Sequence, residues 1–137
     1  MSSTLSPQTA LIYVMVLVSA ADREMTDEEI WTMGEIIRTL PVFENFDREM
    51  LVPAAEGCAE ILQDEDGLET AISLIVSTLP EKLRETAYAL ACDVAAADGQ
   101  VGDEEMQILE MLRHRLPLDR LNAAAIERGA RARYTRL

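Results

Sequence analysis

The chain contains an internal repeat that strongly limits the folds open to it. When the sequence is shifted by 76 positions, nine of the 31 residues between 11 and 41 are identical to their partners, without a gap. The matched segments are Ala20-Ala21-Asp22 with Ala96-Ala97-Asp98, Asp27-Glu28-Glu29 with Asp103-Glu104-Glu105, and Leu40-Pro41 with Leu116-Pro117. Each copy reads as a helix, a short acidic turn and a second helix. We expect the copies, at about 10–41 and 86–117, to pack as a pseudo-symmetric pair of helical hairpins.

The rest of the sequence is also typical of helices. Aromatic residues make up only 4% of the 137 residues, and no segment alternates between polar and apolar residues as a strand would. This length suits one domain. We therefore predict an all-α fold, a single compact domain over 1–137 with about seven helices. The expected ranges are 6–21, 27–39, 47–63, 68–79, 81–97, 103–115 and 118–133. Pro53 should kink the third helix or shift its start.

The first expected helix is unusually apolar. The run from Ala10 to Ala21 is interrupted only by Ser19. It is shorter than the roughly 20 residues that span a bilayer. A signal peptide typically has Lys or Arg before its apolar run, but none precedes this one. A related run also recurs inside the chain, where a signal peptide would not lie. We interpret it as the buried first helix of a cytoplasmic protein.

Helical spacing predicts which side chains face the core. In the second and sixth helices these are Ile30, Met33, Ile37 and Leu40, and Met106, Leu109, Leu112 and Leu116. Met50 should face inward at the start of the third helix. Met25 and Val101 should anchor the two turns in the core, and Trp31 should pack at a helix contact.

The charge is strongly acidic and unevenly distributed. A formal charge of -13 disfavours nucleic-acid binding and suits cations or basic partners. Residues 113–137 nevertheless hold seven arginines against two acids. We favour a basic C-terminal helix, 118–135, that docks on an acidic body. A separate basic contact surface is the alternative.

The two acidic turns hold the candidate site. Gly99 suits a positive φ, and Thr26 and Glu29 have the spacing of a capping box. Asp22 and Asp98 end helices, where the dipole disfavours an anion. Their carboxylates either form Asx-type turns or bind a cation with Glu29 or Glu105. The candidate metal ligands are therefore Asp98, Glu105, Asp22 and Glu29, and calcium or magnesium is the expected ion.

Other sites are disfavoured by the sequence. An EF-hand would need oxygen donors where the second turn has Val94 and Ala96. Cys58 and Cys92 cannot complete a zinc site and are expected to be buried thiols. His114 is expected at the surface, and Asp93 is expected to pair with an arginine. No nucleophile or phosphate-loop motif is present, so we expect a protein that is not an enzyme.

The repeated motif resembles the TerB-like family of tellurite-resistance proteins. The better copy is Ala96-Ala97-Asp98-Gly99-Gln100-Val101 with Glu105, and the weaker is Ala20-Ala21-Asp22 with Glu29, where Arg23 replaces the usual glycine. The match covers about residues 10–117. The resemblance implies a compact all-helical domain linked to tellurite and other stress resistance. It also implies metal binding through the acidic turns and interaction with other proteins in stress assemblies, without an established catalytic activity.

Two functions remain open at this point. The leading hypothesis is a stress-associated, non-enzymatic domain that binds a divalent cation at its acidic turns. The alternative is a helical adaptor for other proteins, whose acidic turns are structural. Neither hypothesis includes nucleic acid or a membrane span.

Overall fold

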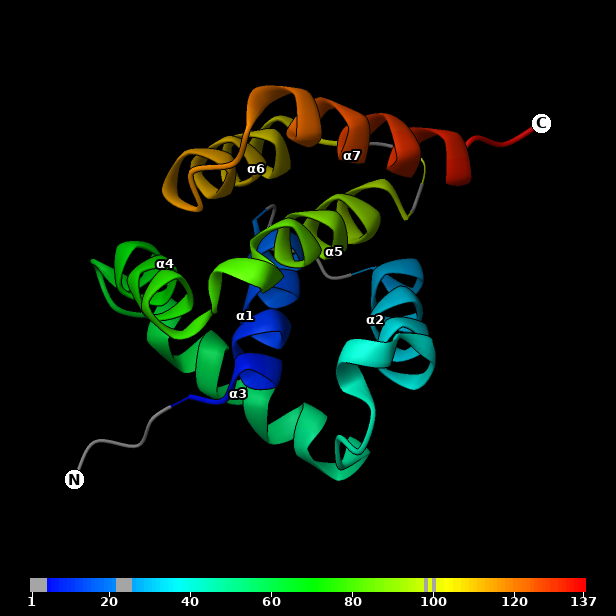
Figure 1. The fold of residues 1–137 in the computed structure, drawn as a ribbon. Coiled ribbons are helices and arrows are strands. Elements are labelled where there is room, and N and C mark those ends of the chain that lie inside the picture. The colour runs from blue at the N-terminus through cyan, green and yellow to red at the C-terminus, as the bar shows by residue number, and fades with distance from the viewer. Residues whose placement is uncertain (1–4, 22–25, 98, 100) are drawn as a thin grey trace.

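The first helix is the centre of the fold. The computed structural model describes residues 5–21, 26–97, 99 and 101–137. Helix α1 (Pro7–Ala20) is buried continuously from Ala10 to Ser19 and packs against α3, α4, α5 and α6. A helix that is apolar on every side is stable only when it is covered on every side. Figure 1 shows α1 (blue) enclosed by the later helices, which confirms the prediction of a buried first helix.

The remaining α-helices are arranged around α1. They are α2 (Asp27–Thr39), α3 (Leu51–Leu62), α4 (Gly67–Thr78), α5 (Arg84–Ala96), α6 (Asp103–Arg115) and α7 (Arg120–Arg133). Three short 3₁₀ segments, η1 (Pro41–Phe43), η2 (Arg48–Met50) and η3 (Glu81–Leu83), lie between them. The described residues thus form the predicted all-α fold with seven α-helices. Among these residues, no helix combines the length and the apolar character needed to cross a membrane.

The proline in the third helix shifts the start of that helix. We predicted a helix over 47–63, but α3 begins at Leu51 after the 3₁₀ turn η2. Pro53 is therefore in the first helical turn, where its missing N–H would have no partner within the helix. Of the two outcomes expected for Pro53, the structure has the shifted start.

The two copies of the repeat match in their element bounds. The helices that enter the turns end at Ala20 and Ala96, and those that leave them begin at Asp27 and Asp103, each 76 positions apart. Helix α2 packs against α5, and α6 packs against α1. The local structure of the hairpins thus corresponds, while their packing as a pseudo-symmetric pair stays a prediction.

The inward face of each hairpin contains most of the predicted residues, but it begins at a different one. The buried side chains of α2 are Glu29, Thr32, Met33, Ile36 and Ile37, and those of α6 are Glu105, Ile108, Leu109 and Leu112. Ile30 and Met106, which we expected inside, are 51% and 55% exposed. The predicted stripe counted only apolar residues. The true stripe begins at a buried glutamate one position earlier, which turns Ile30 and Met106 outward.

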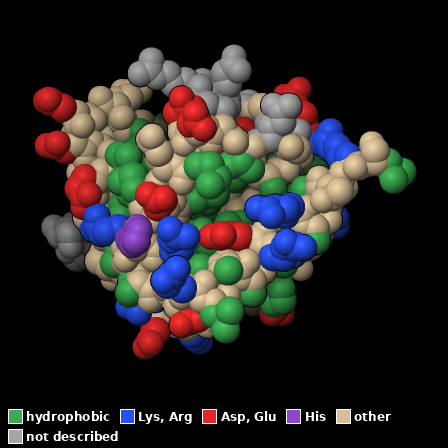
Figure 2. Space-filling view, turned by 90° about the horizontal axis from the view of Figure 1, so that it is seen from above, with side chains coloured by type: hydrophobic (Ala, Val, Ile, Leu, Met, Phe, Trp, Pro, Cys, Tyr) green, Lys and Arg blue, Asp and Glu red, His purple; other side chains and the backbone are tan. Residues whose placement is uncertain are grey.

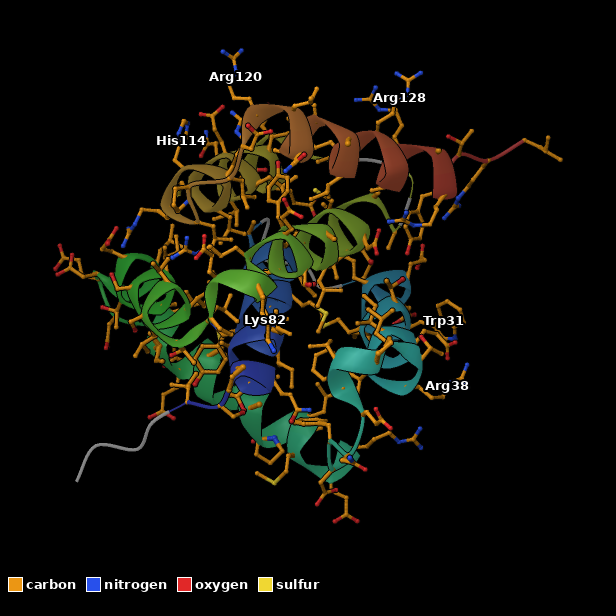
Figure 3. The ribbon with its side chains drawn as sticks, viewed as in Figure 1. Trp31, Arg38, Lys82, His114, Arg120 and Arg128 are labelled. Carbon is orange, nitrogen blue, oxygen red and sulfur yellow. The ribbon has the colours of Figure 1, made fainter. Side chains whose placement is uncertain are left out.

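Three other residues expected inside are exposed. Met50 lies in η2, before α3 begins, and is half exposed. Val101 is 42% exposed and does not anchor the second turn in the core. Trp31 is 67% exposed on the outer side of α2, where Figure 3 shows it pointing away from the body. Met25 lies outside the described residues.

The basic last helix docks on the body, as we favoured. Helix α7 packs along α5, and Arg133 forms an ion pair with Asp93 of that helix. Near its other end, the Asn122 amide donates a hydrogen bond to Glu85 at 2.8 Å. Other arginines of α7 point to solvent, as Figure 3 shows for Arg120 and Arg128. The same view shows His114 at the surface, in agreement with the sequence.

Candidate functional site

The first turn ends in a complete capping box. Thr26 has extended backbone angles, and its hydroxyl accepts a hydrogen bond from the Glu29 N–H at 3.1 Å. The Glu29 carboxylate in turn accepts the Thr26 N–H at 2.9 Å. This reciprocal pair satisfies two of the donors that a helix start leaves without partners. The predicted capping box is therefore confirmed.

The second turn has the same design with one part missing. Gly102 takes the capping position and has no side chain, so only the carboxylate half remains. The Gly102 N–H donates to Oε1 of Glu105 at 3.0 Å. Upstream, Gly99 has a φ of +86° and donates its N–H to the carbonyl of Ala96. That φ favours glycine and confirms the prediction.

The two capping glutamates are unusual because they are buried. Glu29 is 1% exposed and Glu105 is 2% exposed. Burial of a carboxylate costs free energy unless hydrogen bonds or cations compensate it. The positive end of each helix dipole and the capping N–H supply part of that compensation. Each turn thus places one carboxylate inside the protein at an equivalent position.

The other two predicted metal ligands, Asp22 and Asp98, lie outside the described residues. Within the described ranges, no group of three or more His, Cys, Asp or Glu side chains is placed to hold a metal ion. Glu29 and Glu105 come from different turns, so the structure describes one of the predicted ligands at each turn.

A second feature, which the sequence analysis missed, is a trough above α5. Helices α6 and α7 both pack on α5, while α6 and α7 make little contact with each other in the part of the chain described. The resulting pocket has a volume of about 430 Å³. Figure 1 shows α6 (orange-yellow) and α7 (orange to red) as a separate layer over α5. We call this pocket the α5 trough, bounded by α5, α6, α7 and residues 134–136.

Three helices line the α5 trough at helical spacing. Its floor is Tyr88, Cys92, Ala95 and Ala96 of α5. One wall is Met106, Leu109, Glu110 and Arg113 of α6, and the other is Glu127, Ala130, Arg131 and Tyr134. Each set repeats at intervals of three and four residues, so each presents one helix face to the same space. This spacing was the available sequence signal, but the convergence of three faces depends on tertiary packing.

Polar groups at one end of the α5 trough are already engaged. The Tyr88 hydroxyl donates a short hydrogen bond to Glu127, and the Arg113 guanidinium lies 3.8 Å from the same carboxylate. Burial, reinforced by the hydrogen bond to Glu127, raises the pKa of Tyr88 well above its ordinary value. Tyr88 therefore stays a neutral donor at physiological pH.

The cysteines are suited to packing. Both are free and buried. Burial raises the pKa of Cys58 and of Cys92 to about 12. Because the thiolate is the reactive species, such thiols are poor nucleophiles and poor metal ligands. Their predicted role as buried thiols is confirmed.

The sequence model of the family described as tellurite resistance protein TerB matches residues 8–128. No curated protein and no solved structure shows significant similarity to the chain.

Proposed function

The chain belongs to the TerB family of tellurite-resistance proteins, and from that premise we propose that it is a non-enzymatic domain that binds a divalent cation at its two acidic turns. The association with tellurite resistance follows from the family. The cation is the further step, and the burial of Glu29 and Glu105 at equivalent positions is the observation that carries it.

A carboxylate can interact with more than one partner at a time. Each carboxylate has two oxygens and about four lone pairs, so a carboxylate that accepts a capping hydrogen bond at Oε1 can ligate a cation as well. An aspartate lies seven residues earlier in each copy, Asp22 before Glu29 and Asp98 before Glu105. Oxygen ligands of this kind suit calcium or magnesium. The ligand set that we propose is Asp98 with Glu105, and Asp22 with Glu29.

The second turn is the better candidate of the two. Arg23 follows Asp22, whereas Gly99 follows Asp98. A guanidinium next to a ligand carboxylate repels a cation and competes for the same oxygens. We therefore expect the second turn to bind more tightly.

Titration with calcium and with magnesium tests the proposal. We expect heat in calorimetry and amide NMR shifts confined to the two turns, 22–29 and 98–105. The Glu105→Gln variant retains an oxygen that can accept the Gly102 N–H but removes the charge. It should therefore keep its melting temperature and lose most of the affinity of the second turn. Asp98→Asn should have the same effect.

The matched control is Glu104→Gln, which removes one charge from an exposed neighbour outside the ligand set. It should retain binding. If millimolar calcium or magnesium gives neither heat nor shifts, or if Glu104→Gln weakens binding as much as Glu105→Gln, the cation proposal is wrong.

One observation favours the adaptor as a second candidate. Ile30 and Trp31 are large apolar side chains exposed next to each other on α2, and exposed tryptophans are enriched in protein interfaces. A partner that co-purifies with wild type should be lost with Trp31→Ala. It should be retained with Leu121→Ala, which removes an exposed apolar side chain from α7. If both variants retain the partner equally, the surface of Ile30 and Trp31 is not its binding site.

A further inference from the structure

The α5 trough lies outside the proposed cation ligands and has the character of a small-molecule site. Its volume of about 430 Å³ lies within the range of roughly 300–1,000 Å³ that is usual for such sites. The floor is almost closed to solvent, since Tyr88, Cys92 and Ala95 are at most 4% exposed. The walls, in contrast, expose apolar surface at Val101 and Met106. A ligand would therefore enter from the open side and cover these side chains.

Small side chains create the space. Ala95 and Ala96 line the floor and Ala130 lines the α7 wall, each with a single methyl group as its side chain. Figure 2 shows this face, where hydrophobic side chains lie near the centre and both basic and acidic side chains lie around them. An apolar ligand body fits this centre because burial there removes apolar surface from water.

The charges around the α5 trough favour an anion. Among the described residues, its lining includes three arginines, Arg113, Arg131 and Arg136, against two glutamates, Glu110 and Glu127. Glu127 already interacts with Tyr88 and Arg113. Arg136 donates a hydrogen bond to the carbonyl of Ala97 at 3.3 Å. Arg131 makes no hydrogen bond or ion pair through its guanidinium to another described residue. Among the residues that the structure describes, this guanidinium beside the apolar surface has no partner.

From this combination we propose that the α5 trough binds a small amphipathic carboxylate, an aryl or medium-chain alkyl acid. Its apolar body lies over Ala95, Ala96 and Met106, and its carboxylate meets Arg131. A guanidinium binds a carboxylate through two parallel hydrogen bonds, which is stronger than contact with a neutral group. The net charge of the whole chain repels anions. The local excess of arginine makes this surface an exception.

Three probes with one apolar body and different head groups test the proposal. They are phenylbutyrate, phenylbutanol and phenylbutylamine, each titrated into the full chain and followed by amide NMR. We expect phenylbutyrate to bind at least tenfold more tightly than the alcohol, and the amine to bind least. The shifts should map to residues 88–96, 106–113 and 127–136. Equal affinities for the three probes, or no shifts with phenylbutyrate, would overturn the proposal.

Two pairs of variants locate the ligand. Arg131→Glu should weaken phenylbutyrate binding at least tenfold, whereas Arg128→Glu makes the same charge change on α7 at a residue that points to solvent and should have little effect. Ala96→Phe should block the floor. Its control is Ala20→Phe at the equivalent position of the first copy, where both alanines are partly exposed.

The same titrations separate a protein partner from a small molecule. If phenylbutyrate binds no better than the alcohol while an acidic amphipathic helical peptide shifts the same residues, the α5 trough is a protein-docking groove and our proposal is wrong. If Arg128→Glu weakens phenylbutyrate as much as Arg131→Glu, the effect is one of general charge and the proposal is again wrong.

Discussion

At the scale of single residues, the buried carboxylates matter most, because burial of a charged group costs free energy unless other groups compensate it. Among the described carboxylates Glu29 and Glu105 are the most deeply buried, and each accepts a backbone N–H from the residue that caps its helix. Asp93 is partly buried against α7 and pairs with Arg133. The sequence predicted the Glu29 contact and an arginine partner for Asp93. It did not identify Arg133, because 40 residues separate the two in the chain.

The stability of the protein should depend on pH through the titration of Asp93. Burial raises the pKa of Asp93 above the ordinary value of 3.8, against the opposing effect of the Arg133 guanidinium. The folded state therefore holds this proton more tightly than the unfolded chain does. The contribution of Asp93 to the free energy of unfolding must then fall as the pH rises from about 3.8 through its folded pKa. Since asparagine does not titrate, Asp93→Asn should gain stability relative to wild type over this window.

Urea unfolding of both proteins at a series of pH values measures this difference. Asp64→Asn, in the exposed turn between α3 and α4, is the control for loss of a surface charge. If Asp93→Asn instead loses stability relative to wild type as the pH rises over this window, the effect of Arg133 on the pKa of Asp93 outweighs that of burial.

At the scale of elements, helix caps explain why the hairpin bounds could be predicted so closely. Helices α2 and α6 span the predicted ranges, 27–39 and 103–115. Capping residues and the Leu-Pro steps that follow these helices act within a few residues, so the local sequence is enough to place them. Spacing predicted the middle of each inward face correctly, but not the residue at which that face begins. Spacing allows two adjacent stripes, and contact with α5 or α1 selects the one that includes Glu29 or Glu105.

The two caps should respond in opposite directions to substitution. Thr26→Ala removes the hydroxyl that accepts the Glu29 N–H and should cost about 1 kcal/mol of unfolding free energy. Gly102→Ser adds such a hydroxyl and should gain a few tenths of a kcal/mol. There is room for the new side chain, because a Cβ at Gly102 would lie 3.7 Å from Oε2 of Glu104, at ordinary contact distance.

Chemical denaturation, fitted with one m-value for all variants, measures both changes in unfolding free energy. A loss of stability in Gly102→Ser would show that the extended backbone of Gly102 is not an equivalent capping position.

At the scale of the whole molecule, α1 connects the other helices. It contacts α3, α4, α5 and α6, and its side chains from Ala10 to Val18 belong to the hydrophobic core. A domain of this size is stable by only about 5–15 kcal/mol, so the packing of a central helix decides whether it folds. Helix α7 packs on α5, and α6 packs on α5, α1 and α4. In the described part of the chain α6 and α7 make little contact with each other, which leaves the trough open.

Truncation in this central helix should be costly. Leu11 is fully buried, and Leu11→Ala should lower the unfolding free energy by about 2–5 kcal/mol because it removes apolar contacts and leaves a cavity. Leu121→Ala makes the same chemical change at a residue that is 77% exposed, and should change it by less than about 0.5 kcal/mol. Thermal and urea unfolding of the pair measure both values. Similar values for the two variants would mean that α1 is not the packing centre.

The sequence alone determined the all-α class, the bounds of the two hairpins, the capping box at Thr26 and the positive φ of Gly99, because each depends on interactions within a few residues. It also determined the burial of α1, because an apolar surface on every side of a helix must be covered. Only the tertiary structure decided that Ile30, Trp31 and Met106 face solvent while Glu29 and Glu105 are buried. It alone also paired Asp93 with Arg133 and opened the α5 trough. These features depend on which helices meet and at what distance, and that is set by the packing of segments far apart in the chain.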